Sequence, residues 1–304
     1  MTRHRTRGSA ASVRTRLLTL SRERGEEFQR VLVRFGIERL LYRLSQSEHA
    51  AGFVLKGATL FSVWADTPHR PTKDLDLLGF GSPDPDRLVE VFVAVVQAPV
   101  EADGIVFDAA SITASEIRAD QEYDGIRLTM EAMLGTARIP IQVDVGFGDA
   151  TAIPPAPVEV PTLLSDQPAP TLRAYSREVV VAEKFHAIVH LGLPNTRMKD
   201  YYDLVVLSRR FEFDGAPLGE AVAATFERRG TAVPKTCPEG LDDDFATDAT
   251  KTKQWRAFLR RTGVEDDQEL LDVVRALRAF LLPVATAVVE DGPAGAWPPG
   301  GPWG

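Results

Sequence analysis

Two aspartates, Asp74 and Asp76, are separated by a single leucine. On a β-strand, side chains two residues apart point to the same face, so these carboxylates would stand roughly 6–7 Å apart at their bases. That spacing lets both converge on a pair of magnesium ions, which prefer hard oxygen ligands and keep positions for phosphate oxygens. Asp-x-Asp is common, however, and two solvated aspartates on an exposed strand would give the same pattern.

A glycine, Gly57, precedes this pair, directly after the short apolar segment 53–55. The residues that follow predict a helix to about residue 65. Backbone amides and the helix dipole at such a turn form a natural anion site. A carboxylate pair beside this turn suits a nucleoside triphosphate that carries magnesium.

Asp144 interrupts an apolar run, Ile-Gln-Val-Asp-Val, at residues 141–145. A strand this apolar favours a central place in a sheet, where a charge must be paired or bind a metal. The same alternation also fits the outward face of a half-exposed strand. As a third carboxylate, Asp144 would complete the ligand set of a two-metal site and help to deprotonate an attacking hydroxyl.

Lys184 lies on or beside the apolar stripe of a predicted helix, four residues from both Val180 and Ile188. A lysine there either extends to solvent or meets an anion, and lysine is a common phosphate ligand. An ordinary amphipathic helix with a solvated lysine is the alternative.

A charged segment at 197–204 follows, with Arg197, Asp200 and Asp203 at spacings of i,i+3. A plain surface row of charges would look the same, with each opposite pair worth a few tenths of a kcal/mol. His186 and Cys237 carry less weight, because a lone histidine beside an apolar face is usually structural. No Cys/His metal spacing and no Walker motif occurs.

The elements that must position these residues fall into two parts. The first part alternates strands and helices, and the second is helical, which argues against a regular doubly wound sheet. Residues 151–170 are rich in proline and are expected to cross the surface between the parts. The predicted strands are 53–55, 74–78 and several within 104–147; the predicted helices are 26–47, 57–65, 84–97, 176–190, 197–210, 218–228, 251–261 and 268–289.

The length of 304 residues suggests about two domains. We expect four segments: an arginine-rich arm at 1–25 that is flexible over 1–12, a core at 26–155, a helical domain at 156–292, and a disordered tail at 293–304. The single cysteine forms no internal disulfide, and no apolar run reaches the roughly 18 residues that span a bilayer. These features predict a cytoplasmic protein without a membrane partner.

The charge is uneven along the chain. Thirty-five basic and 43 acidic residues give a net charge of −8, which argues against broad coating of nucleic acid. Residues 1–34, however, hold nine arginines against three glutamates. Four of the few lysines, Lys56, Lys73, Lys184 and Lys199, fall within the motifs. One RNA end held at one locally positive site therefore remains compatible with the sequence.

The order of these motifs resembles the AbiEii-type nucleotidyltransferase toxins, which include the MenT toxins. The resemblance spans roughly residues 28–290, and residues 221–234 also look like the helical half of that family. The motifs that carry it are Leu55-Lys56-Gly57-Ala58-Thr59-Leu60, Arg70-Pro71-Thr72-Lys73-Asp74-Leu75-Asp76-Leu77, Val143-Asp144-Val145, Glu183-Lys184, Arg197-Met198-Lys199-Asp200 and Asp203-Leu204.

The resemblance implies an α+β fold, with a polymerase-β-like nucleotidyltransferase domain followed by a helical C-terminal region. It implies Mg²⁺, as two ions, at Asp74, Asp76 and Asp144, an NTP substrate, and Lys184 on the triphosphate. Asp200 and Asp203 belong to the last motif, with either one facing the site. We expect the nucleotide to be bound by Lys56, Gly57, Ala58, Thr72, Lys73, Lys184, Arg197 and Lys199.

The family also implies partners. Its members form bacterial toxin–antitoxin or abortive-infection pairs, and some MenT toxins add pyrimidine nucleotides to the 3′ acceptor end of tRNA, which blocks translation. We therefore expect NMP transfer to that tRNA end, and a cognate antitoxin encoded nearby. One departure is Ala58, since many nucleotidyltransferases have a serine there that contacts phosphate. The spacing from Gly57 to Asp74 is also on the long side.

Two other functions fit the residues. A small-molecule nucleotidyltransferase, like those that inactivate aminoglycosides, shares the order of glycine and Asp-x-Asp. The motif at 197–204 and the arginine-rich arm speak against it. A non-catalytic binding protein on the same scaffold is the third hypothesis, and the retention of three carboxylates and Lys184 argues against that one.

Overall fold

The computed structural model describes residues 9–65, 70, 72–117, 125–148, 153–264, 268–292 and 295–304. The chain forms two compact units, Met1–Gly148 with Ala156–Ala174, and Asp149–Pro155 with Tyr175–Gly304. The first contains a mixed sheet and the second is mainly helical, so the predicted α+β class is confirmed. The sequence predicts a domain boundary after residue 155, whereas residues 156–174 add two strands to the sheet of the first unit.

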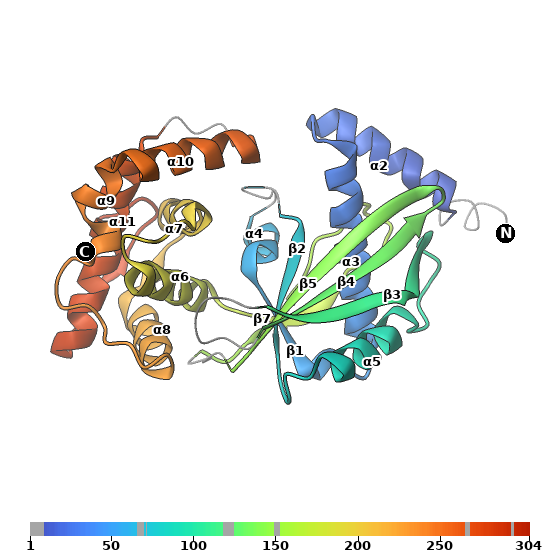
Figure 1. Cartoon of the computed structure of the whole chain (residues 1–304), viewed down its shortest axis with the longest axis horizontal. Helices are drawn as coiled ribbons and strands as arrows, with labels where there is room; N and C mark the ends of the chain where they lie inside the picture. The colour runs from blue at the N-terminus through green and yellow to red at the C-terminus, as the bar shows by residue number, and fades with distance from the viewer. Residues whose placement is uncertain are drawn as a thin grey trace. The chain divides into compact units, whose positions relative to one another are not determined.

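A seven-stranded sheet forms the centre of the first unit, in the order β3-β4-β5-β2-β1-β7-β6 (Figure 1). β2 is parallel to β5 and antiparallel to β1, and β1 is parallel to β7. The three longest strands, β3 to β5, pair as an antiparallel meander. The strands are β1 Phe53–Lys56, β2 Asp74–Gly79, β3 Ile105–Ile117, β4 Gly125–Leu134, β5 Ala137–Phe147, β6 Ala156–Glu159 and β7 Thr171–Ala174.

Helices cover the apolar face of this sheet. α3 (Phe28–Gln46) lies directly against β5, and a Cβ built on Gly36 would come within 2.9 Å of Ile141 Cδ1. α5 (Pro85–Val96) packs on β3, and the carboxylate of Asp84 caps it by accepting from the Asp86 amide at 3.0 Å, as the sequence predicts. The short elements η1 (Ala50–Gly52), η2 (Gly57–Thr59) and α4 (Leu60–Trp64) flank β1.

The expected flexible arm over residues 1–12 is wrong where the structure describes it. α2 runs from Ala10 to Arg24, and its first turn is capped by Ser9, which accepts from the Ser12 amide. Val13 and Leu17 are fully buried on its inner face. This apolar spacing stabilises a helix in a segment whose arginines suggested a tail; residues 1–8 lie outside the described part.

Helices dominate the second unit, where the predicted helices are all present. Two short strands, β8 (Phe213–Asp214) and β9 (Ala296–Trp297), pair beside them. The helical elements are α6 Arg177–Leu191, α7 Met198–Arg210, α8 Gly215–Arg228, η3 Glu239–Leu241, α9 Asp243–Thr247, α10 Ala249–Thr262 and α11 Leu270–Glu290. Within the described residues, none of these or the other helices is long and apolar enough to cross a membrane.

The C-terminal residues 295–304 are ordered, although their composition predicts a disordered tail. Trp297 is buried and donates its indole N–H to the carbonyl of Ser208 at 2.6 Å. Trp303 donates to the carbonyl of Phe280 at 2.9 Å and stacks on its ring. Two tryptophans thus supply the apolar contacts that the glycines and prolines around them cannot.

Candidate active site

The register of three neighbouring strands gathers the predicted carboxylates on one face of the sheet. Asp76 is paired with Asp144 across β2 and β5, and Asp74 is paired with Gln142. On the other side of β2, Lys56 is paired with Asp76. Paired residues point to the same face, and the alternate positions of β2, Leu75 and Leu77, are fully buried on the opposite one. The predicted orientation of the two aspartates is therefore confirmed.

The carboxylate of Asp144 forms an ion pair with Arg127, a residue outside the sequence motifs. Arg127, opposite Asp144 on β4, places Nε 2.8 Å from Oδ1 and Nη2 2.7 Å from Oδ2. The hydrogen bonds that Arg127 donates to Asp144 raise the pKa of Arg127, and the charges of Asp74 and Asp76 raise it further. Only the strand register could have revealed this pair, because the two residues lie far apart in sequence.

The carboxylates of this face fit magnesium in type, and Asp74 and Asp76 lie on the same face of β2. Asp74 and Asp76 present hard oxygens side by side, as Mg²⁺ requires. Both carboxylate oxygens of Asp144 accept hydrogen bonds from Arg127. The side-chain nitrogen of Gln142 lies 3.3 Å from one of these oxygens. Accordingly, the described residues contain no group of three or more His, Cys, Asp or Glu side chains arranged to hold a metal ion.

Gly57 brings the backbone into contact with Asp76. It begins η2 directly after β1 with φ of 73°, and a Cβ built on it would lie 2.0 Å from Oδ2 of Asp76. Both the conformation and the contact therefore require glycine. The turn also contains a hydroxyl that sequence reasoning missed: Oγ1 of Thr59 is buried and has no hydrogen-bond partner in the described structure.

The segment before Asp74 borders a cavity. Thr72 donates its hydroxyl to the carbonyl of Asp74 at 3.1 Å, and Lys73 is exposed beside it. Together with Asp74, these two residues line a cavity of about 470 Å³ that lies wholly within the first unit. The structure thus brings two of the predicted nucleotide-binding residues to the same cavity as one predicted metal ligand.

In the second unit, Lys184 joins both aspartates of the last motif. Its Nζ on α6 lies 2.7 Å from Oδ1 of Asp200 and 2.8 Å from Oδ2 of Asp203, both on α7. The two carboxylates are fully buried, so both face Lys184 rather than one facing it and one facing solvent. The alternative of a solvated charge row is wrong for these two residues.

Two further cations stand at the start of α7. Nε of Arg197 lies 2.6 Å from Oδ2 of Asp200, and its side chain is half exposed. Burial alone would raise the pKa of Asp200, but Lys184, Arg197 and the exposed Lys199 together lower it to about 2. The cluster is thus an ionised network, held by charges of both signs at the junction of α6 and α7.

His186 has a structural environment, in line with expectation. The guanidinium of Arg229 lies 3.1 Å from Nδ1, which must therefore accept, so Nε2 carries the proton and donates to Thr231 at 3.0 Å. Burial, and then the charges of Arg229 and His190, lower the pKa of His186 to about 4. The imidazole is neutral at pH 7.

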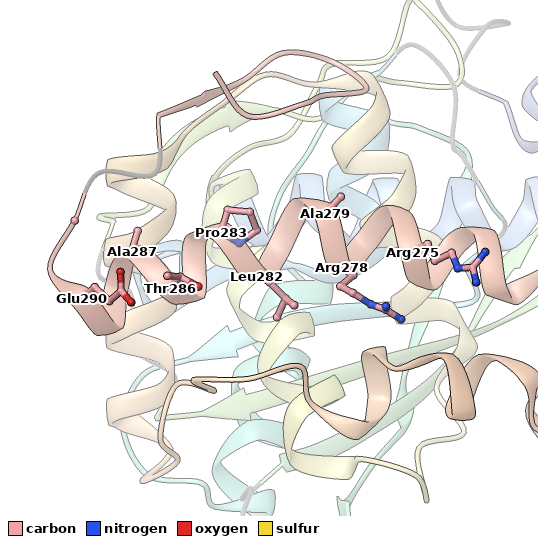
Figure 2. A pocket seen from close by; sticks show the side chains of 9 residues that line it. Arg275, Arg278, Ala279, Leu282, Pro283, Thr286, Ala287 and Glu290 are labelled. Atoms are coloured by element: carbon pink, nitrogen blue, oxygen red, sulfur yellow. The ribbon is translucent and has the colours of Figure 1, made fainter.

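A larger cavity, of about 800 Å³, lies along α11 in the second unit (Figure 2). Its lining within the described structure includes none of the predicted site residues. The two arginines at one end, Arg275 and Arg278, are already paired with Asp243 of α9. The larger volume of this cavity is therefore not a reason to assign it a role in the reaction.

The comparisons with known proteins identify the family. The family model described as "Nucleotidyl transferase AbiEii toxin, Type IV TA system" matches residues 39–281. The chain therefore belongs to the AbiEii family of nucleotidyl transferase toxins of type IV toxin–antitoxin systems, as the motifs predict. A search of curated proteins gave no match.

Two solved structures from Helicobacter pylori are similar to the chain at 13% identity. JHP933 has a TM-score of 0.46, with 83% of this chain and 90% of that chain covered. A "putative nucleotidyltransferase from H. pylori" has a TM-score of 0.43, with 83% and 93% covered. The family assignment rests on the family model.

Proposed function

We propose that this member of the AbiEii family transfers a nucleoside monophosphate from an NTP to RNA, with the 3′ acceptor end of tRNA as the acceptor. The observation that carries the proposal is the row of Asp74, Asp76 and Asp144 on one face of the sheet, beside the turn at Gly57. Such a row is suited to holding magnesium, which would stabilise a phosphoryl group under attack. Blocked aminoacylation, and hence blocked translation, would be the toxic effect.

In this reaction the terminal 3′-oxygen of the RNA forms a bond to the α-phosphorus of the NTP. The bond from that phosphorus to the bridging oxygen of the β-phosphate breaks, and pyrophosphate leaves. Asp74 and Asp76 would hold magnesium, which when bound neutralises charge on the phosphates. Asp144 would accept the proton of the attacking hydroxyl or join the ligand set, and for either role Arg127 must release one of its oxygens.

The phosphates have candidate partners around Asp76. In the first unit, Lys56 and Gly57 border Asp76, the backbone amides of Gly57 and Ala58 would bind phosphate, and the hydroxyl of Thr59 in the same turn would replace the group that Ala58 lacks. Thr72 and Lys73 line the cavity on the other side of Asp74, away from the turn at Gly57, and are not assigned to the phosphates. The family resemblance also implies Lys184, Arg197 and Lys199 as ligands of the triphosphate.

Membership of a toxin–antitoxin family implies an antitoxin partner. We propose that it is encoded beside this chain, and that toxin and antitoxin act in the cytoplasm, where tRNA is available.

The test follows label from an α-labelled NTP into bulk tRNA, with each of the four NTPs in turn. Asp74→Asn and Asp76→Asn should each abolish the transfer, because each removes one charged oxygen donor. Asp86→Asn, at an exposed position in the first turn of α5, is the matched control and should keep full activity. Full transfer by both site variants would overturn the mechanism, and label on an aminoglycoside instead of RNA would overturn the acceptor.

A further inference from the structure

The cavity beside Asp74 exists because β2 is shorter than β5. The pairing of the two strands begins at Asp74 and Gln142, while β5 begins five residues earlier, at Ala137. The edge of β5 before Gln142 is therefore not covered by β2, and the start of α3 forms the opposite wall through Gln29 and Arg30. The space enclosed is about 470 Å³, which is enough for a nucleoside.

The charges around this cavity disfavour a triphosphate. Glu27, Asp74 and Glu131 are acidic and Arg30 and Lys73 are basic, so the acidic side chains outnumber the basic ones. Arg30 is paired with Glu27 at 3.3 Å, and Glu131 is paired with Arg138 at 3.4 Å, so the cavity has no excess of positive charge to offer a triphosphate.

Most of the other lining side chains are hydrogen-bonding and neutral. They include the hydroxyls of Ser111 and Thr129 and the amides of Gln29 and Gln142. Carboxylates and amide oxygens accept hydrogen bonds from ribose hydroxyls and from the amino groups of bases. The lining therefore matches a nucleoside that enters without phosphates of its own.

The order of the strands places this cavity opposite the glycine turn. Asp76 contacts Gly57 on the β1 side of β2, whereas Asp74 lines the cavity on the β5 side. In-line phosphoryl transfer needs the attacking oxygen and the leaving group on opposite sides of the phosphorus. If the turn binds phosphates, the attacking hydroxyl must come from the side of the cavity.

We infer that this cavity binds the terminal nucleoside of the RNA acceptor, so that its 3′-hydroxyl lies beside Asp74. This inference rests on the proposed function, and adds to it a subsite formed by the first unit alone. The triphosphate of the incoming nucleotide lies outside the cavity. Blocking the cavity should therefore weaken the binding of the acceptor and leave the binding of the NTP unchanged.

A matched pair of variants on one helix provides the test. Gln29→Trp places a large ring at the wall of the cavity, and Gln46→Trp makes the same change at an exposed position at the other end of α3. We expect Gln29→Trp to raise the KM for tRNA about tenfold or more, a loss of roughly 1.4 kcal/mol of binding, with the KM for the NTP within about twofold. Gln46→Trp should change neither.

Direct binding separates this inference from the proposed function. A 5′-labelled single-stranded RNA with a free 3′-hydroxyl should bind the wild-type chain and bind Gln29→Trp at least about tenfold more weakly. The same RNA with a 3′-phosphate should bind the wild type weakly, because the cavity has no excess of positive charge and Asp74 would repel the phosphate. If wild type binds RNA in this way but transfers no label, the cavity assignment stands and the proposed reaction is wrong.

Two results would overturn the inference. One is a raised KM for the NTP with an unchanged KM for tRNA in Gln29→Trp, which would place the incoming nucleotide in the cavity. The other is an unchanged affinity for RNA in both Gln29→Trp and Thr129→Val, the second of which removes a hydroxyl of the lining while keeping its shape.

Discussion

Arg127 binds both oxygens of Asp144, at 2.8 and 2.7 Å, so a cation of the protein occupies the third carboxylate of the row. The side chain of Arg127 is 42% exposed and that of Asp144 is 20% exposed, so the pair is accessible to solvent. Exposed pairs of this kind contribute little to stability. Its importance lies instead in the charge it sets beside Asp74 and Asp76, and in its competition with a metal ion.

Replacing this cation should change the affinity for magnesium. Arg127→Gln leaves three carboxylates without the guanidinium, and their combined charge attracts a divalent ion more strongly. We expect the magnesium concentration that gives half-maximal transfer to fall several-fold, and Mg²⁺ to raise the Tm of the variant more than that of the wild type. Arg138→Gln, at an exposed residue on β5, is the control. An unchanged or increased magnesium requirement would mean that Arg127 does not compete with the ion.

A second prediction separates the two requirements for glycine at position 57. Gly57 and Gly25 have φ of 73° and 64°, in the left-handed region, so replacing either by alanine should cost about 1–2 kcal/mol of stability. Only at Gly57 would the new methyl collide with a side chain, that of Asp76; around Gly25 there is open space. Transfer should therefore be lost in Gly57→Ala and kept in Gly25→Ala. Equal activities of the two variants would show that the contact with Asp76 is not needed.

The buried network in the second unit makes a prediction about stability. Lys184→Met leaves Asp200 and Asp203 fully buried without their shared ammonium, which should cost about 3–5 kcal/mol in the free energy of unfolding. Adding Asp203→Asn removes one of the two charges and should recover part of that loss. Chemical denaturation of the single and double variants at pH 7 measures both. No recovery in the double variant would contradict the electrostatic explanation.

The sequence predicted the elements around the site better than the contacts within it. The alternation of side chains along β2 was enough to predict that Asp74 and Asp76 share a face, because that depends on local periodicity alone. The partner of Asp144 depended on which residue of β4 stood opposite, and the pairing of Lys184 with two carboxylates depended on how α6 packs on α7. Strand register and tertiary packing set such relationships, and neither can be read from the local pattern of a single sequence.

Composition misled the prediction at both ends of the chain. The arginines before Leu17 suggested a flexible arm, but this segment contains a helix whose inner face is apolar. The glycines and prolines around Trp297 suggested a disordered tail, but this segment is ordered. In both places a few buried side chains outweigh many polar or flexible neighbours. The average composition of a segment reflects most of its residues, whereas its order depends on the positions of the few side chains that are buried.

The final prediction concerns the pH dependence of stability, and it follows from His186. Its pKa in the folded chain is about 4, below the ordinary 6.5, because burial, Arg229 and His190 disfavour the imidazolium. Above pH 6.5 the side chain is neutral in both states, and its contribution to stability is fully present. Between pH 6.5 and 4 the unfolded chain binds the proton first, so stability falls as the pH falls. Below about pH 4 both states are protonated and the loss is complete, at roughly 3 kcal/mol.

Denaturation followed by tryptophan fluorescence measures this loss, because Trp255, Trp297 and Trp303 all belong to the second unit, which contains His186. The free energy of unfolding is compared at pH 7, 5.5 and 4.5 in the wild type and in His186→Gln, whose amide can still bond to Thr231. Carboxylates titrate in both proteins, so the difference between the two isolates the imidazole. The wild type should lose more stability than the variant over this range. Parallel losses would show that His186 takes up its proton as easily in the folded chain as in the unfolded one.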